Sequence, residues 1–320
     1  MSAPPLDRRM AHRLRFRHLE LIATVYDFGG ILRASQRLNL TQPAVTKSLQ
    51  DVEALLGVQL FVRSSRGLTP THYGEAFVRH AKIVLAQLRH SAEELQNLRE
   101  GFGGHVTVGT LLAASAELLP RAIIALKDER PNVAITVFDG TYDVLIPRLR
   151  MGDLDLVLGR IPEGIQADDL VYEAFYAEKT DLVCRREHPL ARRRRLVLAD
   201  LLSEPWLLPV PESHLRRQLE RIFAEQKLPF PKNIVESVSA LTNRALIDGS
   251  DIIGVLPHHV ARADIEKARF VRLPVELRGT ESQVGAMMRA PRDLRPSAAA
   301  LLDHLHTIGR SMAVADEAKR

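Results

Sequence analysis

Two short amphipathic stretches joined by a tight turn constrain the first part of this 320-residue chain most strongly. Apolar residues recur at helical spacing over 16–28 and stop at Gly29, and a second short helix is expected over 31–38. Thr41 is a good N-cap, and Pro43 suits the first turn of the next helix, where its missing N–H is not needed. This pattern predicts a helix-turn-helix, whose second helix enters the major groove of DNA.

The helix that begins after Thr41 carries, in its first turns, side chains that suit base edges. Gln42 can pair with adenine, Thr46 can contact a base or a thymine methyl group, and Lys47 can reach guanine or a phosphate. The segment 59–71 reads as a β-hairpin with a basic tip, which is typical of a DNA-binding wing; the alternative is a small helical domain with an ordinary hairpin. The residues predicted to contact double-stranded DNA are Arg33, Ser35, Thr41, Gln42, Pro43, Ala44, Thr46, Lys47, Arg63 and Arg66.

The distribution of charge favours the same interpretation. Residues 1–71 hold ten Lys and Arg against five Asp and Glu, whereas the rest of the chain holds 34 of each kind. The whole excess of +5 therefore lies in the first part of the chain. A small basic module joined to a neutral body is expected of a protein that binds phosphate at one end, although an excess this modest also arises by chance.

The segment 34–49 resembles the N-terminal domain of LysR-type transcriptional regulators. The shared pattern is an alanine, a leucine after a short spacer and then Ser/Thr-Gln-Pro-Ala, all within 34–44, and it continues to Leu-Thr-Pro-Thr at 68–71. Thr46 and Lys47 replace the Ser-Arg pair of most members, which resembles the branch that includes regulators of aromatic-acid degradation and of sugar-binding proteins. The resemblance implies a bacterial transcription regulator that reads an inverted-repeat promoter site and is not an enzyme.

Residues 72–99 contain no proline and a single glycine, which predicts one long helix. Apolar residues repeat along it at alternating steps of four and three, interrupted by Ser91, as in a coiled coil. A helix packed on its own chain is the alternative, but a two-fold dimer fits two DNA half-sites. The resemblance implies that this helix dimerises, commonly on the way to a tetramer. The residues predicted to form the seam are Phe77, Ala81, Val84, Leu88, Leu95 and Leu98.

From residue 105 onward strands alternate with helices, and the same order recurs from residue 206. This predicts two similar α/β lobes with mainly parallel sheets, and the resemblance implies a periplasmic-binding-protein-like effector domain. The expected fold is α/β with an all-α winged helix-turn-helix domain at the N-terminus and a long linker helix. The predicted boundaries are 14–71 for the winged helix-turn-helix, 72–100 for the dimerisation linker helix and 105–320 for the effector domain, with lobe I at about 105–177 plus 278–320 and lobe II at about 178–277.

Two such lobes facing each other form a cleft. In open α/β sheets the ligand lies beyond the carboxyl ends of the strands, against helix N-termini. The predicted wall of the cleft is 109–113, 139–142, 159–161, 209–213 and 237–240.

Arg160 ends a central strand at the cleft and is the cation we select for a carboxylate, with a surface arginine as an equal alternative. Many LysR-type regulators have Ser or Thr where this chain has Leu111, so either Thr110 takes over that role or the pocket is more apolar there. The residues predicted to bind a small organic acid, with a sugar or a sulfonate as the alternative ligand, are Thr110, Leu111, Leu112, Thr141, Arg160, Pro209, Pro211, Ser213, Ser237 and Ser239.

The cysteine and histidine content and the lack of a long apolar run argue against disulfide-rich, metal-binding and membrane-spanning proteins. Cys184 is the only cysteine, so we expect no internal disulfide framework. We expect a reducing, cytoplasmic location. It lies in an apolar strand and is expected to be inert, although neighbouring arginines could lower its pKa. The histidines at 258–259, 304 and 306 lack metal-site spacing, and no apolar run reaches the roughly 18–20 residues of a membrane span. We expect no metal, no cofactor and no catalysis; the expected partners are DNA, a small effector and further copies of the chain, with RNA polymerase as a candidate.

Overall fold

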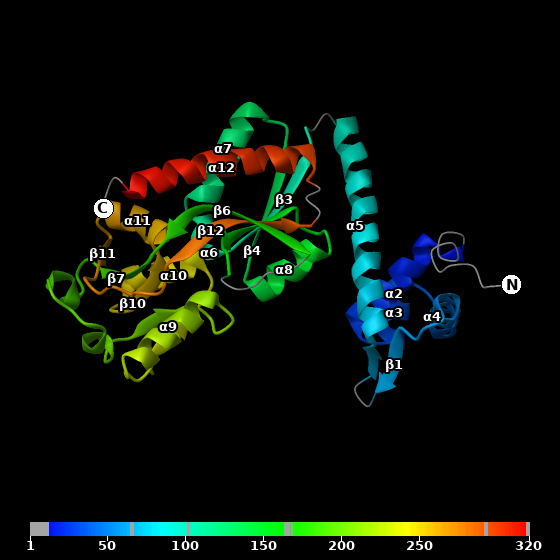
Figure 1. Ribbon diagram of the computed structural model, residues 1–320, viewed down its shortest axis with the longest axis horizontal. Coiled ribbons are helices and arrows are strands. Elements are labelled where there is room, and N and C mark those ends of the chain that lie inside the picture. The colour runs from blue at the N-terminus through cyan, green and yellow to red at the C-terminus, as the bar shows by residue number, and fades with distance from the viewer. Residues whose placement is uncertain are drawn as a thin grey trace. The chain divides into compact units, whose positions relative to one another are not determined.

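The computed structural model describes residues 13–64, 67–100, 103–162, 167, 169–290 and 294–317 (Figure 1). Contacts divide the chain into two compact units. The first holds the N-terminal part up to Gln96 together with the short segment 150–153, and the second holds the remainder. Each unit has its own hydrophobic core.

Three helices build the N-terminal unit, and local sequence explains where they begin and end. The first ends at Gly29, whose φ of 61° is the left-handed conformation that glycine adopts without strain. The third begins after Thr41, whose Oγ1 accepts a hydrogen bond from Ala44 N at 3.4 Å, and Pro43 lies in its first turn. The predicted helix-turn-helix is confirmed. Its helices are α2 Phe16–Phe28, α3 Ile31–Leu38 and α4 Gln42–Leu56.

A hairpin follows α4 and is held to it by one carboxylate. Strand β1, Phe61–Ser64, pairs antiparallel with β2, Gly67–Pro70. Glu53 Oε1 on α4 accepts hydrogen bonds from Leu60 N at 2.7 Å and Phe61 N at 3.1 Å. Because hydrogen bonds to a charged acceptor are stronger than neutral ones, Glu53 fixes the place where the wing leaves α4.

The long helix α5, His72–Glu100, begins against the same segment. Thr71 Oγ1 donates to Gln59 O at 2.7 Å and accepts from Gly74 N at 3.1 Å. A Cβ atom at Gly74 would lie 2.0 Å from the carbonyl oxygen of Leu60, so this approach requires glycine. The first turns of α5 therefore pack on the core of the N-terminal unit.

Lobe I of the second unit has a five-stranded sheet in the order β4-β3-β5-β12-β6. Its first three strands along the chain are parallel, and β12 is antiparallel to both of its neighbours. Successive side chains of a strand point to opposite faces, so Leu156 and Leu158 join the core under α7 and α12, whereas Val157 joins the core under α8. The elements are β3 His105–Thr110, α6 Leu112–Ser115, α7 Leu118–Glu129, β4 Ala134–Asp139, α8 Tyr142–Arg150, β5 Leu156–Arg160, β6 Leu170–Glu178, β12 Ser282–Arg289 and α12 Pro296–Glu317.

Lobe II has a second five-stranded sheet, in the order β11-β7-β10-β8-β9. Strands β8, β9 and β10 are parallel, and β7 is antiparallel to its neighbours. Trp206 is fully buried in its core and packs edge-on against Phe223, with ring centroids 5.8 Å apart. The elements are β7 Thr180–Arg185, the 3-10 helices Pro189–Arg192 and Leu198–Leu201, β8 Trp206–Leu208, α9 His214–Glu225, β9 Ile234–Glu236, α10 Ala240–Gly249, β10 Ile253–Pro257, α11 His258–Glu266 and β11 Phe270–Arg272.

The predicted two-lobed architecture is confirmed, and the chain passes between the two sheets twice. The first crossing is at Lys179, between β6 and β7, and the second lies between β11 and β12. In lobe I, two separate helices, α6 and α7, follow β3. The chain turns at Glu117, whose φ of −131° is not helical, and this turn lets the buried Leu118 and Leu119 face the core.

Candidate effector site and DNA-binding surface

A cavity of about 460 Å³ lies between the lobes of the second unit, at the carboxyl ends of parallel strands. Its wall combines strand ends with the first residues of α8, α9 and α10. Lobe I contributes Thr110, Leu111, Leu112, Ala113, Ser115, Asp139, Gly140, Thr141, Tyr142 and Arg160. Lobe II contributes Leu207, Leu208, Pro209, Ser213, His214, Leu215, Ser237, Val238, Ser239, Ala240, Leu241, Asn243, Val255 and Pro257.

Nine of the ten residues predicted to bind the effector border this cavity, and Pro211 does not. Ser213 N donates to Val210 O at 2.9 Å, so residues 210–213 form a turn in which Pro211 occupies an outer, exposed position. Sequence reasoning also missed part of the wall: Ser115, Leu207, Leu208, His214, Leu215, Leu241, Asn243, Val255 and Pro257. Asn243 could have been found, because it follows the predicted Ser239 by one helical turn.

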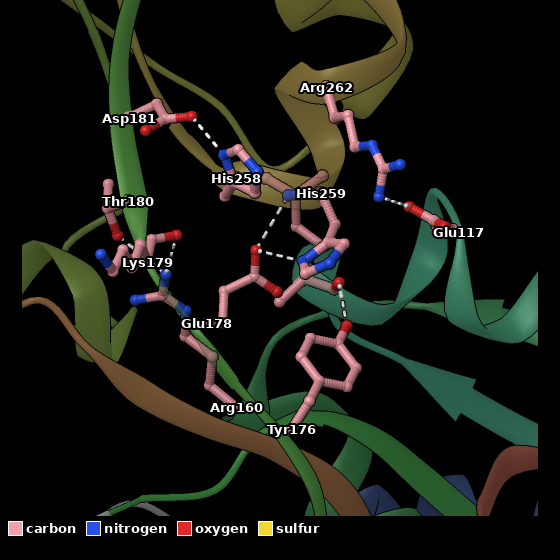
Figure 2. A network of polar contacts seen from close by, with 12 residues as sticks. Glu117, Arg160, Tyr176, Glu178, Lys179, Thr180, Asp181, His258, His259 and Arg262 are labelled. Carbon is pink, nitrogen blue, oxygen red and sulfur yellow. Dashed lines mark hydrogen bonds and ion pairs between the residues drawn. The ribbon is translucent and has the colours of Figure 1, made fainter. Parts of the chain in front are cut away.

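Arg160 is a buried cation at the cavity wall, with 6% of its surface exposed. Its Nη1 donates to Thr280 O at 3.0 Å, and its Nη2 donates to Thr180 Oγ1 at 2.8 Å and to Lys179 O at 3.3 Å (Figure 2). Burial lowers the pKa of the guanidinium, and the negative charge of Glu178 opposes that shift. Arg160 is therefore not a surface arginine, which was the alternative. The protein already uses most N–H donors of its guanidinium, so few remain for a ligand.

Some buried polar atoms of the wall have no hydrogen-bond partner among the described residues. They include the Nε of Arg160, the hydroxyl of Tyr142 and the Oδ1 of Asn243. Burial also raises the pKa of Tyr142, so its hydroxyl stays protonated. An unsatisfied buried polar atom costs roughly 1–3 kcal/mol. The wall is therefore suited to a ligand that carries both donors and acceptors.

Three helices begin at the cavity. Thr141, Ser213 and Ser239 immediately precede α8, α9 and α10, and all three line the cavity. Ser239 Oγ accepts hydrogen bonds from Thr242 N at 3.3 Å, as an N-cap does. The unpaired N–H groups of a helix start favour negative charge. The wall can therefore hold an anionic group without a second buried cation.

The departure from the family pattern near β3 has a steric basis. Leu111 packs against Gly159, where an added Cβ would lie 2.7 Å from the Leu111 Cβ. The neighbouring Thr110 is 1% exposed, and its hydroxyl donates to Leu111 O at 3.1 Å. The cavity is therefore apolar at Leu111, and the Thr110 hydroxyl donates its hydrogen to the backbone.

The start of α4 is the exposed surface that the DNA prediction requires. Thr41, Gln42, Pro43, Ala44 and Lys47 are exposed, Thr46 is half-buried and Arg33 on α3 is exposed. Ser35 is a correction, because it is 4% exposed and its hydroxyl donates to Leu32 O at 2.8 Å inside the unit. The side chain of Arg63 and the whole of Arg66 lie outside what the structure describes.

The predicted seam on α5 divides into a covered and an exposed part. Ala81 is 2% exposed, so its predicted dimer role is wrong within this fold, whereas Phe77 packs on the core of the N-terminal unit but stays half-buried, and its role remains a prediction. Lys82 forms an ion pair with Asp27 on α2, which shows the same packing. The exposed seam residues are Val84 at 45%, Leu88 at 53% and Leu95 at 69%; the side chain of Leu98 lies outside the described part.

The four histidines at 258, 259, 304 and 306 contact carboxylates, and the cysteine is buried. His258 pairs with Asp181, His259 with Glu178, His304 with Glu129 and His306 with Glu173, each across two elements. Within the described ranges, no three His, Cys, Asp or Glu side chains are grouped as they would be around a metal ion. Burial raises the pKa of the Cys184 thiol to about 11, so the alternative of a lowered pKa is wrong.

An exposed helix-turn-helix joined to a domain with a ligand-sized cavity between two lobes defines a one-component transcription regulator. Family models agree: residues 16–75 match the bacterial regulatory helix-turn-helix protein, lysR family, and residues 99–309 match the LysR substrate binding domain. The chain belongs to the LysR family of transcriptional regulators.

Its relatives match it over most of their length. The chain is 34% identical over 295 residues to the transcriptional regulator GbpR of Azospirillum brasilense, covering 92% of this chain and 86% of GbpR. It is 33% identical over 285 residues to the transcriptional regulator PcaQ of Agrobacterium fabrum, covering 89% of this chain and 91% of PcaQ. These relatives are transcriptional regulators and not enzymes, which agrees with the prediction from the sequence.

Solved structures share the fold. A full-length OxyR variant from Pseudomonas aeruginosa matches with a TM-score of 0.60 at 23% identity, over 92% of this chain and 95% of that one. Full-length CbnR complexed with its target DNA matches with a TM-score of 0.60 at 22% identity, over 92% of this chain and 99% of that one. In the part of the chain that the structure describes, no helix is long and apolar enough to cross a membrane.

Proposed function

We propose that this regulator binds an inverted-repeat promoter site through paired α4 helices and is controlled by a small organic acid in the cavity. The observation that carries the ligand proposal is the cavity wall, where three helix starts and the buried Arg160 surround one space. A carboxylate there gains from the helix starts and from the arginine together. A sugar or a sulfonate is the alternative ligand.

The paired arrangement of DNA-binding helices is supported by α5. Val84, Leu88 and Leu95 leave an apolar stripe exposed on a long helix, and such a stripe is stabilised when a second copy covers it. A two-fold dimer presents two α4 helices to two half-sites, and a dimer of dimers extends the same arrangement. We place the protein with the chromosome in the cytoplasm, where RNA polymerase is a further candidate partner.

Calorimetry of the full chain against matched acids tests the ligand proposal. The panel holds aromatic and aliphatic monocarboxylates, with and without hydroxyl groups, and the corresponding sugars and sulfonates as neutral and anionic controls. We expect an acid to bind and Thr141→Val, at the start of α8, to weaken it. Pro211→Ala is the matched control, because Pro211 is near the cavity in sequence but not in its wall. Binding by sugars alone, or by no compound, refutes the acid.

Gel shifts with the DNA next to the protein's own gene test the DNA proposal. We expect one preferred site with two half-sites, bound at lower protein concentration than random DNA of equal length. Equal affinity for both DNAs at several salt concentrations would remove sequence recognition from the proposal.

A further inference from the structure

Arg160 lies where the cavity wall meets both passages of the chain between the lobes. It ends β5 in lobe I and borders the cavity. Lys179 and Thr180 belong to the first crossing, and Thr280 belongs to the second, just before β12. One guanidinium bonds to all three of these residues.

The contact extends into lobe II through the first crossing. Lys179 O accepts a second hydrogen bond, from His258 N at 2.9 Å, at the start of α11. The neighbouring Glu178 Oε1 accepts from His259 N at 3.0 Å, and Figure 2 shows these groups beside Arg160. A shift of the guanidinium therefore changes the bonding of a backbone oxygen that also holds α11.

The geometry of the guanidinium suits this bridge. Its planar fork presents several N–H donors in fixed directions, so it can bond to two separate segments at once. A lysine ammonium carries the same charge on a flexible stem and lacks that fork. The bridge thus depends on arginine specifically and not on positive charge alone.

The guanidinium also retains an unused donor at the cavity wall. Its Nε is buried and has no hydrogen-bond partner in the described part of the chain. An acceptor group of a ligand that bonds this Nε draws on the same planar cation that holds the two crossings through Nη1 and Nη2, so ligand and crossings share one guanidinium. Differential contact of this kind is what a ligand needs in order to shift a conformational equilibrium.

We propose that Arg160 is a positioning residue that clamps both crossings and couples occupation of the cavity to the angle between the lobes. The identity of the ligand rests on the proposed function, but the clamp itself does not. Its effect is therefore measurable in the protein without any ligand.

Hydrogen exchange on the unliganded full chain tests the clamp with Arg160→Lys. We expect amide exchange over 178–182 and 278–284 to become about tenfold faster or more, because both segments lose their shared partner. The control is Arg216→Lys: Arg216 is 7% exposed and bonds to Pro209, Glu220 and Glu236, all within lobe II. Unchanged exchange at both crossings, or the same change in Arg216→Lys, overturns the clamp.

Footprinting with the tightest-binding acid of the panel tests the coupling. We expect wild type to change its footprint on the DNA next to its own gene when the acid is added. Asn243→Ala should need more acid but reach the same change at saturation, whereas Arg160→Lys should show less than about a third of it at saturation. A full change in saturated Arg160→Lys overturns the coupling. If no acid binds wild type, the ligand proposal fails, and hydrogen exchange still decides the clamp.

Discussion

The helix-turn-helix and the effector cavity present their polar groups in opposite ways. At the start of α4, Thr41, Gln42 and Lys47 are exposed and lie within seven consecutive residues. In the cavity, Arg160 and Asn243 are 6% and 4% exposed and come from different lobes. The surface proposed for DNA is thus built by local sequence, whereas the site proposed for the ligand is built from buried polar groups that two lobes bring together.

The largest effect is expected where the DNA-binding surface depends on close packing. Gly74→Ala should lower the free energy of unfolding of the N-terminal unit by roughly 1–3 kcal/mol, because the new Cβ meets the Leu60 carbonyl oxygen. This outweighs the helix propensity gained, about 1 kcal/mol. Urea denaturation followed by circular dichroism measures the loss, and DNA binding should fall with it.

Gly30→Ala is the matched control for this experiment. Nothing lies within 4 Å of a Cβ at Gly30, and its φ of 179° is extended backbone that alanine adopts. Equal destabilisation by the two substitutions would contradict the packing explanation.

Substitutions of two polar residues in the N-terminal unit, one exposed and one buried, should have different effects on DNA binding. Gln42→Ala should weaken binding to the preferred site by about 1–3 kcal/mol and leave random DNA unaffected, because Gln42 is exposed and placed for a base edge. Ser35→Ala should leave site preference unchanged, since its hydroxyl is buried. Competition gel shifts with both DNAs measure the difference. A loss of preference in Ser35→Ala would mean that burial does not decide which residues read DNA.

In the cavity, replacing a polar side chain should weaken ligand binding without lowering the stability of the protein. Asn243→Leu should lower affinity for the bound acid by about tenfold, yet leave the unliganded protein as stable or more stable, because it replaces an amide whose buried Oδ1 is unsatisfied by an apolar group of similar size. Calorimetry and thermal unfolding measure the two effects. If Asn243→Leu lowered stability and left affinity unchanged, Asn243 would stabilise the fold and would not bind the ligand. The contrast between cavity and DNA-binding surface would then fail.

The smallest effect concerns Cys184, which belongs to neither recognition surface. Burial raises its pKa to about 11, above the value in an unfolded chain, so its contribution to stability is complete below about pH 8 and is lost as the pH rises toward 11. The difference in unfolding free energy between wild type and Cys184→Ala should therefore shrink from pH 7 to pH 10.5. A difference that grows with pH would reverse the sign of the shift.

The errors of the sequence-based predictions share a physical origin. Ser35 lies in the right motif and Ala81 lies at the right heptad step, but both are covered by their own unit. Pro211 lies in the right loop on its outer side. Periodicity and motif identify an element and its face, whereas burial depends on what packs against that face.

Local signals in the amino-acid sequence predicted the caps of α2 and α4, the hairpin, the long α5 and the repeated strand–helix order. Helix periodicity, capping and turn preferences act over a few residues, so they can be recognised along the chain. The bonds of Arg160 to Lys179 and Thr280, and the shared cavity of Tyr142 and Asn243, arise from packing. These contacts join residues far apart in the chain, and the packing of two sheets, not a local preference, brings them together.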